Sequence, residues 1–566
     1  MTSNVRVAPG KGCILVVDDV DRLKIWVKGW IDSEDFKKIL RIADYMGRNR
    51  GISYFRLSKN KVLSSGLSID EILSILDDVG AEYDPEIEGV LNDYLRVSRG
   101  SAILSFDGER ICIKFERYLG KLYDKLRDLL RYDSKDKIFY TLPYKYHELR
   151  TRLHDLGFNV EDLTGFRSDL PLNIDAVFTG ELRDYQEDAM KSWLKNGGRG
   201  VIALPTGAGK TVIGVASVTK VKQRTLVIAY TKEQLMQWRD AFLKFTNIPE
   251  YSIGLYYSKE KRIAPITLAT YQTAYKHTAK LAPYFNYIII DEVHHLPAEK
   301  FKHIAVSMPS KYRLGLSATP YREDGKHVIL FPLMGGIVYH RTPQELAEKG
   351  YLAKYRIITI KVPLLPAEKR RYEELKREFR RLAGYVGFDT IVDAARRGDP
   401  RAIQALRIHS EMRQIIQKSE AKLRRVEEII RRELAEGSKI IVFAHYVDLA
   451  KTLADRVKAY LLTGEMDARE RRRVLEEFKR CRSGVLVVTT VGDEGLDIPD
   501  ANVGILVAGT GSRRQFIQRL GRLLRPGERK EARLYEVVAK GTAEEIQSRK
   551  RKKIDMQDFK DLTNVE

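Results

Sequence analysis

Two long parts of the chain alternate short apolar, β-branched runs with amphipathic stretches. The first part lies between residues 182 and 331, and the second between residues 439 and 538. Such runs are typical of strands buried on both faces of a parallel sheet, with helices between them. The pattern therefore predicts an α/β fold with two parallel sheets. The expected strands cover 200–204, 225–230, 265–270, 287–290 and 312–317, then 439–443, 460–462, 485–490, 503–507 and 532–537.

The first 175 residues follow a different, α+β pattern. Ser33 is a helix N-terminal signal, with Asp35 in the first turn. Asp107-Gly108 between two alternating runs predicts a β-hairpin. The expected strands are 23–30, 101–106, 110–115 and 138–141, and the expected helices are Ser33 to about Tyr45, 69–79, 118–130 and 144–156.

A helical, basic segment from about Pro366 to Glu436 separates the two α/β parts. Its apolar positions recur at helical spacing between Ile416 and Ile430, which indicates packing. Its cations form either a binding face or a solvated helix paired with nearby glutamates, and the pattern leaves both open. The cations are Arg370, Arg371, Lys376, Arg377, Arg380 and Arg381.

Composition narrows the classes of protein that fit. At 566 residues and 43% hydrophobic content, the chain is long enough for three or four domains. No apolar run of about 20 residues and no leader pattern is present, so we expect neither a membrane span nor secretion. Cys13, Cys112 and Cys481 lie far apart, which indicates a reduced intracellular compartment without a structural zinc site. The net charge of +22 favours binding to a polyanion over an inert basic surface.

The segment from Leu204 to Thr211 follows an apolar strand and precedes a helix. Its glycines can bend the backbone so that several N–H groups face a phosphate at the helix N-terminus. Lys210 adds charge for the terminal phosphates, and the Thr211 hydroxyl suits Mg²⁺. Leu204 stands where a strict phosphate loop has its first glycine, and the alternative is an ordinary turn with a surface lysine. The candidate phosphate-binding residues are Thr206, Gly207, Ala208, Gly209, Lys210 and Thr211.

Two further features fit a nucleotide site. Asp291 and Glu292 end an apolar run, which predicts a carboxylate pair at the tip of a buried strand. Asp291 can hold Mg²⁺ and Glu292 can polarise a water, although a lone Asp-Glu is more often a helix cap. Upstream, Arg183 and Gln186 open a helix, and the Gln186 amide can pair with an adenine edge.

The second α/β part supplies candidate cations. Gln518 begins a segment in which Arg522 and Arg525 are three residues apart, and so share one face of an expected helix. Arginine neutralises charge on a transferring phosphoryl group, and such residues would make closure between the two parts depend on nucleotide. The alternative is that these arginines contact a nucleic-acid backbone.

These pieces, in this order, resemble superfamily 2 helicases and translocases, and the resemblance is greatest to the XPB group. The acidic box reads Asp-Glu-Val-His, and Arg322-Glu323-Asp324 follows Ser317-Ala-Thr-Pro320. Gly511-Ser-Arg-Arg-Gln515 leads into Gln518-Arg-Leu-Gly-Arg522, and Thr489 begins a loop containing Gly495 and Asp497. Departures are Thr206, where that group often has Cys, the segment Gly495-Leu-Asp497, which is closer to the general superfamily pattern, and the long N-terminal stretch.

The resemblance implies ATP and Mg²⁺ as cofactors and 3′-to-5′ movement on single-stranded, forked or duplex DNA. It further implies work in nucleotide excision repair or promoter opening, with a nuclease or other repair or transcription protein as partner. An archaeal source, and hence a cytoplasmic, nucleoid-associated location, fits that group. Gly495 and Asp497 would line the nucleotide cleft, and Arg322, Glu323 and Asp324 would engage DNA, although without the resemblance they read as a charged turn.

The expected architecture is two RecA-like parallel-sheet domains with a helical thumb-like insertion and an α+β N-terminal region. We expect segments 1–100 (of unknown role), 101–178 (similar to a damage-recognition domain), 179–345 (ATP-binding domain), 366–436 (thumb), 437–545 (second RecA-like domain) and 546–566 (basic tail).

Loops at the top of both sheets are expected to hold one DNA strand by its phosphates. Trp238 and Tyr271 could stack on bases, although aromatic residues beside apolar strands more often pack in the core. The candidates are Thr231, Gln237, Trp238, Thr270, Tyr271, Gln272, His445 and Thr489.

Two other functions remain open at this stage. An RNA helicase would keep the motor, but the absence of Asp-Glu-Ala-Asp counts against it. An ATP-regulated DNA-binding scaffold would need no strand movement. A restriction-type motor lacks an evident nuclease cluster in this sequence.

Overall fold

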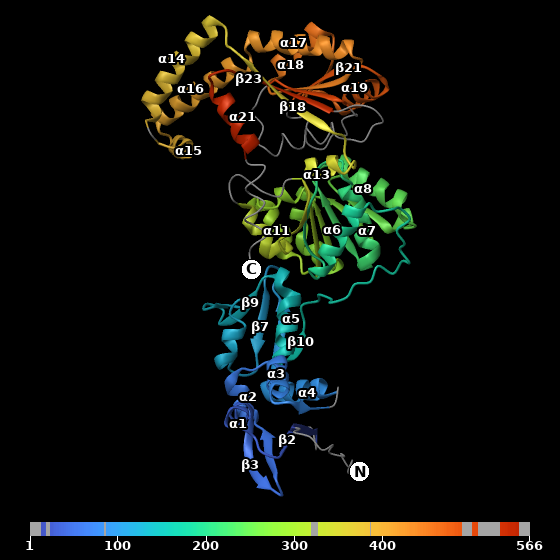
Figure 1. Cartoon of the computed structure of the whole chain (residues 1–566), viewed down its shortest axis with the longest axis vertical. Coiled ribbons are helices and arrows are strands. Elements are labelled where there is room, and N and C mark those ends of the chain that lie inside the picture. The colour runs from blue at the N-terminus through green and yellow to red at the C-terminus, as the bar shows by residue number, and fades with distance from the viewer. Residues whose placement is uncertain are drawn as a thin grey trace.

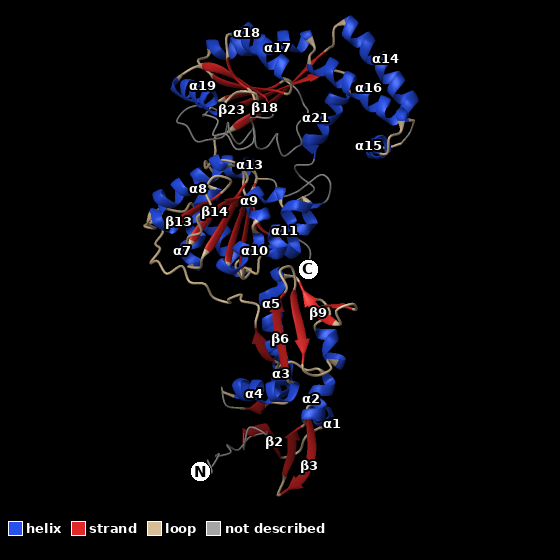
Figure 2. Ribbon diagram, turned by 180° about the vertical axis from the view of Figure 1, so that it is seen from behind, coloured by secondary structure: helices blue, strands red, loops and turns tan. Residues whose placement is uncertain are grey.

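The computed structural model describes residues 13–17, 23–83, 86–318, 326–384, 386–489, 501–507 and 532–553. Within these residues, four sheets follow one another along the long axis of the molecule (Figure 1). Two small sheets lie toward one end, and two parallel sheets with flanking helices lie toward the other (Figure 2). No helix in this part of the chain has the length and apolar character needed to cross a bilayer.

The first sheet has five strands in the order β3-β4-β2-β1-β5. The predicted helix to Tyr45 is wrong beyond Leu40. The reason is that Tyr45 lies opposite Phe55 in an antiparallel ladder, so residues from Ala43 onward make strand hydrogen bonds instead. The elements are β1 (Cys13–Val17), β2 (Leu23–Lys28), α1 (Ser33–Leu40), β3 (Ala43–Asn49), β4 (Ile52–Leu57), α2 (Lys59–Ser65), α3 (Ile69–Asp78), β5 (Ala81–Glu82) and α4 (Ile87–Arg99).

The second sheet also has five strands, in the order β10-β6-β7-β9-β8, and contains the predicted hairpin. The predicted helix over 118–130 is wrong, because only a short 3₁₀ segment forms. Its buried leucines, Leu119, Leu122, Leu126 and Leu129, fit turns closed by i-to-i+3 hydrogen bonds. The elements are β6 (Ser101–Phe106), β7 (Ile111–Phe115), η1 (Gly120–Lys125), β8 (Arg131–Asp133), β9 (Ile138–Thr141), η2 (Pro143–Lys145), α5 (Tyr146–Asp155) and β10 (Asn159–Asp162).

The first lobe is built on a seven-stranded parallel sheet in the order β13-β14-β12-β15-β16-β11-β17. Its central strands are buried throughout, as their continuous apolar runs predict. The elements are α6 (Asp184–Lys195), β11 (Arg199–Ala203), α7 (Lys210–Val221), β12 (Thr225–Ala229), α8 (Lys232–Phe245), η3 (Glu250–Ser252), β13 (Ile253–Tyr256), β14 (Ile266–Thr270), α9 (Tyr271–Lys276), α10 (Thr278–Leu281), η4 (Ala282–Tyr284), β15 (Tyr287–Asp291), η5 (Val293–His295), α11 (Glu299–Ser307), β16 (Tyr312–Ser317), η6 (Lys326–Ile329), α12 (Leu330–Met334), β17 (Ile337–His340) and α13 (Pro343–Glu348).

The second lobe is built on a six-stranded parallel sheet in the order β18-β23-β22-β19-β21-β20. Its edge strand β18 lies between the first lobe and the insertion, in a segment for which the sequence analysis predicted no element. The expected basic tail was to begin at residue 546, but helix α21 continues to Lys553. Ser548 in this helix is buried, so the start of the expected tail is part of the folded lobe. The elements are β18 (Tyr355–Val362), α17 (Glu420–Ala435), β19 (Lys439–Ala444), α18 (Val447–Val457), β20 (Tyr460–Leu462), α19 (Ala468–Arg480), β21 (Gly484–Thr489), β22 (Val503–Leu506), β23 (Ala532–Ala539) and α21 (Ala543–Lys553).

The helical insertion is shorter than predicted. It consists of α14 (Pro366–Ala383), α15 (Phe388–Arg396) and α16 (Pro400–Gln417), which share their own small core. Residues 420–435 form α17, whose Leu423, Val426 and Ile430 instead pack in the core of the second lobe. The apolar stripe from Ile416 to Ile430 therefore spans two helices that serve two cores.

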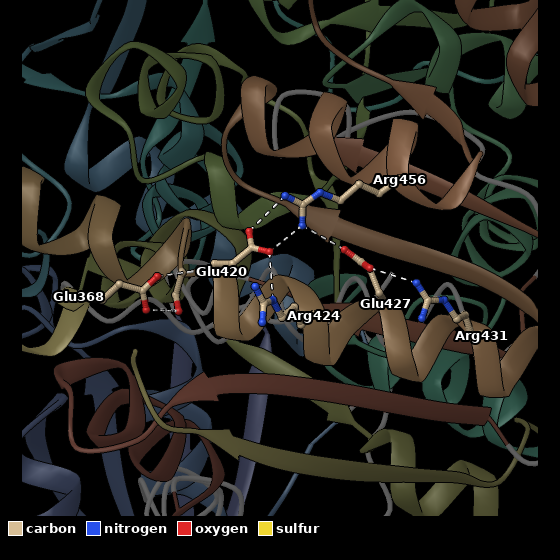
Figure 3. Close-up of polar contacts among 7 residues, drawn as sticks. Glu368, Glu420, Arg424, Glu427, Arg431 and Arg456 are labelled. Atoms are coloured by element: carbon tan, nitrogen blue, oxygen red, sulfur yellow. Dashed lines mark hydrogen bonds and ion pairs between the residues drawn. The ribbon is translucent and has the colours of Figure 1, made fainter. Parts of the chain in front are cut away.

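A carboxylate network fixes α14 to the second lobe (Figure 3). Glu368 accepts hydrogen bonds from the Ser419 hydroxyl at 2.8 Å and from the Glu420 backbone at 2.9 Å. Arg456 of α18 pairs with Glu420 at 3.0 Å and with Glu427 at 3.1 Å. Exposed pairs of this kind are individually weak, but a connected set holds the base of α14 in one orientation.

Buried Arg313 ties β16 to the helices beside it. Its guanidinium donates to the carbonyl oxygens of Ser310 at 3.1 Å, Ala305 at 2.9 Å and Leu333 at 3.0 Å, and also to that of Met308. No carboxylate faces it among the described residues, and burial lowers its pKa well below the ordinary value. Carbonyl oxygens at the ends of α11 and α12 thus replace water around this cation.

We expect Arg313→Met to destabilise the first lobe by about 3 to 5 kcal/mol, because it leaves several buried carbonyls without donors. Urea unfolding followed by tryptophan fluorescence measures this, since buried Trp193 and Trp238 report on the lobe. Lys311→Met, at an exposed neighbouring position, is the control and is expected to change the midpoint little. Equal midpoints for the two variants would contradict the assigned role of Arg313.

Candidate functional site

The loop between β11 and α7 has the backbone geometry of an anion site. Gly207 and Gly209 have φ of +84° and +75°, a region that favours glycine. Lys210 opens α7, and its ammonium donates to the carbonyls of Leu204 at 3.1 Å and Pro205 at 3.2 Å. The lysine thus lies against the loop, where its charge and the helix N-terminus act on the same space.

Gln186 supports this loop rather than presenting a free amide edge. Its Nε2 donates to the Ala208 carbonyl at 3.0 Å, and its Oε1 accepts from the Arg183 backbone at 2.9 Å. A Cβ on Gly209 would lie 2.4 Å from Nε2, so the close approach requires glycine. The side chain is buried, and its described bonds count against direct pairing with adenine.

Arg183 lies at the N-terminus of α6 and contacts a different part of the lobe. Its Nη1 donates to the Tyr351 carbonyl at 3.2 Å, and its guanidinium lies 5.9 Å from the Tyr351 ring centroid. The nearby Tyr185 hydroxyl donates to Ala208 at 2.9 Å. The start of α6 is therefore joined to the loop mainly through Tyr185 and Gln186.

Asp291 lies at the carboxyl end of β15, as the apolar run predicted. Its Oδ1 accepts from the Glu292 backbone at 2.9 Å, and its Oδ2 accepts from the Trp238 indole at 2.9 Å. Burial raises the pKa of Asp291 to about 6, and the adjacent Glu292 charge adds to the rise. The Trp238 donor and the Lys210 charge act in the opposite direction and favour the carboxylate.

Glu292 adopts a left-handed backbone, with φ of +46°, which turns its side chain toward His294. Its Oε2 lies 3.2 Å from His294 Nδ1, which is also 3.0 Å from the Ser317 hydroxyl. Burial favours the neutral acid, but the His294 hydrogen bond and charge, with Lys210 and His295, outweigh it and lower the pKa of Glu292 to about 2. The two adjacent carboxyls therefore have well-separated affinities for protons, and Glu292 is the stronger acid.

The structure corrects the nucleic-acid assignment of two aromatic residues. Trp238 is only 1% exposed and donates to Asp291. Tyr271 is fully buried, and its hydroxyl donates to the backbone carbonyls of Asp291 at 3.0 Å and Glu292 at 3.3 Å. Neither ring is available to stack on a base, and both instead support the acidic tip of β15.

The other predicted nucleic-acid contacts lie at strand ends or in the helices that follow them. Thr231 and Thr270 are N-caps of α8 and α9, so their hydroxyls already make local hydrogen bonds. Thr489 ends β21 and is buried, with its hydroxyl unpaired among the described residues. Gln237 and Gln272 are exposed, whereas His445, directly after β19, lies against the Tyr446 ring.

Two features near the site escaped the sequence analysis. Tyr230, at the end of β12, stacks on His295 with ring centroids 4.5 Å apart. His294 connects Glu292 to Ser317 at the end of β16. The Asp-Glu-Val-His spacing placed His294 beside the acids, but its partner Ser317 is distant in sequence and could not be read from that spacing.

Eight predicted site residues lie outside the described residues. They are Arg322, Glu323, Asp324, Gly495, Asp497, Gln518, Arg522 and Arg525. The structure joins Lys210, Asp291 and Glu292 at one edge of the first sheet, and their convergence with arginines of the second lobe stays a prediction.

The residues present fit Mg²⁺-bound ATP. Mg²⁺ is usually held by one or two carboxylates and by substrate phosphates rather than by a full protein cage. Asp291 and Thr211 offer oxygens of the required kind, and Lys210 offers a cation. Among the described residues, no group of three or more His, Cys, Asp or Glu side chains is placed to hold a metal ion.

Comparison with known families finds two matches. Residues 179–322 match the model described as Type III restriction enzyme, res subunit, and residues 404–563 match the model described as ERCC3/RAD25/XPB C-terminal helicase. Neither of these models extends to residues before 179.

Individual relatives include the DNA 3′-5′ translocase XPB2 of Sulfurisphaera tokodaii, which is 37% identical over 431 residues, or 75% of this chain and 95% of the relative. The DNA 3′-5′ helicase XPB of Kineococcus radiotolerans is 33% identical, covering 71% of this chain and 68% of the relative. The general transcription and DNA repair factor IIH helicase/translocase subunit XPB of Danio rerio is 30% identical, and the match covers 72% of this chain and 51% of the relative. Among solved structures, the Pyrococcus furiosus Hef helicase domain has a TM-score of 0.47 and 23% identity, covering 65% of this chain and 98% of that chain.

We expect Trp238→Phe to raise the pH below which Mg²⁺-dependent ATP binding is lost. The indole lowers the pKa of Asp291, so its removal raises that pKa above about 6, and protonation removes the carboxylate at a higher pH. Titration with ATP and Mg²⁺ between about pH 5.5 and 8 measures the shift.

Trp193→Phe is the matched control. Trp193 is equally buried and donates its indole N–H to the Arg313 carbonyl at 3.0 Å, away from the acids. Both variants should be less stable by about 1 to 3 kcal/mol, but only Trp238→Phe should shift the binding profile. Identical profiles would mean that the indole does not tune Asp291.

Proposed function

This chain belongs to the XPB family of DNA 3′-5′ helicases and translocases, and from that premise we propose that it uses ATP hydrolysis to move along DNA. We further propose that it acts in nucleotide excision repair, in promoter opening, or in both. The observation that carries the motor is the convergence of Lys210, Asp291 and Glu292 at one edge of the first sheet. An ATP-regulated scaffold would need only an acid such as Asp291 to hold Mg²⁺, whereas Glu292 beside it adds a group that can activate a water for hydrolysis.

Each side chain has a distinct proposed role. Lys210 and the amides of its loop bind the terminal phosphates, and Thr211 with Asp291 holds Mg²⁺. Glu292 remains an anion at physiological pH, because His294 lowers its pKa, and so can accept a hydrogen bond from the attacking water. Bound Mg²⁺ neutralises charge on the phosphate oxygens.

The second lobe is proposed to complete the site. Gln518, Arg522 and Arg525 would act on the phosphates, and Gly495 and Asp497 would line the same cleft. Because these side chains belong to a separate lobe, closure around the nucleotide and reopening after hydrolysis would change the distance between DNA contacts on the two lobes. Arg322, Glu323 and Asp324 are proposed to engage the DNA strands.

The insertion offers a cationic face that suits duplex or single-stranded DNA. Lys376 pairs with Glu373 at 3.3 Å, and Arg371 pairs with Glu374 at 3.5 Å, so part of α14 is internally neutralised. Arg370, Arg377, Arg380 and Arg381 are exposed, and no ion pair among the described residues involves them. We propose that these four hold phosphates while the Glu368 network keeps α14 fixed to the second lobe (Figure 3).

We also propose a partner and a cellular location for this protein, on the basis of its family. A nuclease or another repair or transcription protein is the expected partner, since unwinding alone completes neither process. A prokaryotic, archaeal source would place the protein in the cytoplasm with the nucleoid.

We expect DNA, and not RNA, to raise the rate of ATP hydrolysis. Turnover is measured in parallel with single-stranded DNA, forked DNA, duplex DNA and an RNA of matched length. A higher stimulation by RNA than by every DNA would favour the RNA-helicase alternative over the proposal.

We expect Glu292→Gln to lower ATP turnover by about 10²- to 10⁴-fold while ATP binding remains, because the amide keeps the shape but cannot accept a proton. Strand movement should stop with it. Glu299→Gln, at an exposed position of α11, is the control and should behave as wild type. Unchanged DNA remodelling by Glu292→Gln would instead indicate the ATP-regulated scaffold.

A further inference from the structure

The outward face of the N-terminal sheet carries aromatic rings and cations side by side. In β2 and β4, alternate residues point inward, so Leu23, Ile25 and Phe55 are buried. The intervening residues form cross-strand pairs on the other face: Lys24 with Arg56, Trp26 with Tyr54, and Lys28 with Ile52.

The two rings at the centre of this face are half-buried, contact each other and line a hollow. The Trp26 and Tyr54 centroids lie 5.8 Å apart, at an interplanar angle of 71°. On the next strand, a bulge places Gly47 opposite Tyr54. Gly47 has φ of +118°, and a Cβ there would meet nothing within 4 Å. The position beside Tyr54 is therefore left without a side chain, and a hollow of about 280 Å³ is lined by Lys24, Trp26, Met46, Tyr54, Phe55 and Arg56.

The charge around the rings is positive. Arg56 donates to the Met46 sulfur at 3.6 Å, which holds its guanidinium along the row. Asp44, the acid in register with Arg56, pairs with Lys61 at 2.9 Å. Hydrogen bonds from Lys61 and Ser58 lower the pKa of Asp44, and the charges of Lys61 and Arg56 add to this more weakly. Lys24 and Lys28 lie four residues apart on one strand, about 13 Å at the usual strand rise.

A third ring, that of Trp30, extends the face beyond the end of β2 and is exposed. Trp30 is 81% exposed, and the Arg48 guanidinium lies 6.0 Å from its ring centroid. Arg48 is held there by a hydrogen bond to the Gly29 carbonyl at 3.1 Å. An indole this exposed has no packing role within the described residues, although its contact with a cation orders it.

We infer that this face, defined by Lys24, Trp26, Lys28, Tyr54 and Arg56 with Trp30 at its edge, binds a short segment of single-stranded DNA. Bases stack on aromatic rings presented by a sheet, and neighbouring cations neutralise the phosphates. Stacking tolerates any sequence, because every base has a flat face. An acidic protein would match the cations but would not account for two rings flanking an open hollow.

The inference rests on the proposed action on DNA and adds a contact that the two lobes do not provide. The sheet lies at the end of the molecule away from the lobes (Figures 1 and 2). A strand held there would be a different stretch of DNA from the one between the lobes. The N-terminal sheet would then retain a separated strand while the lobes move.

The test uses the full-length chain and a fluorescein-labelled oligothymidine, with binding followed by anisotropy without nucleotide. We expect Tyr54→Leu to weaken binding about tenfold and Tyr54→Phe to restore it, because only the ring is needed. Lys24→Glu combined with Arg56→Glu should also weaken binding. This double variant should lower the slope of log affinity against log salt by about 0.7 for each phosphate that it no longer neutralises. Lys37→Glu, at an exposed position of α1, is the charge control.

DNA-stimulated ATP turnover separates failure of this inference from failure of the proposed function. The face variants should need more DNA for half-maximal stimulation while the maximal rate is kept. If the wild-type chain shows no stimulation by DNA, the proposed function is wrong. A second outcome would overturn the inference alone. DNA would stimulate the wild-type chain, but Tyr54→Leu and the double variant would have the wild-type affinity for oligothymidine and the wild-type dependence of that affinity on salt. The sheet would then not bind DNA. Weakening by Lys37→Glu equal to that of the double variant would also overturn the inference, since only net charge would then matter.

Discussion

The half-buried pair of adjacent carboxyls at the tip of β15 is the constraint on which the first lobe depends. Two neighbouring negative charges that are partly removed from water are costly unless donors and cations surround them. Trp238 serves Asp291, His294 serves Glu292, and Lys210 acts on both. The donors come from different elements, so the arrangement requires the whole sheet to be assembled before the acids can be accommodated.

The same requirement explains why several polar and aromatic residues face inward. Tyr271 supports the backbone of the acids, and Gln186 supports the phosphate loop from α6. Gly214 lets Trp238 approach, since a Cβ there would lie 2.4 Å from the indole. A site built in this way is preorganised, because its polar groups are held by the protein before any ligand arrives.

The second lobe uses charge differently. Buried Lys422 pairs with Glu544 at 2.9 Å, which joins α17 to α21 across the edge of the sheet. The partly exposed set of Glu368, Glu420 and Arg456 fixes the insertion from outside. Together these interactions make the insertion and the second sheet one mechanical unit, so a movement of that lobe would carry the cationic face of α14 with it.

The sequence by itself determined the two parallel sheets, the loop before Lys210 and the position of Asp291 and Glu292 at a strand end. These are local consequences of apolar runs, glycines and spacing, which the chain carries wherever it folds. Prediction from the sequence was wrong where long-range packing decided the outcome. Tyr45 was expected in a helix but lies in a strand opposite Phe55. Trp238 was a candidate for base stacking but donates to Asp291, 53 residues away in sequence. Only the tertiary structure could settle these, because burial and hydrogen-bond partners depend on which distant residues come together.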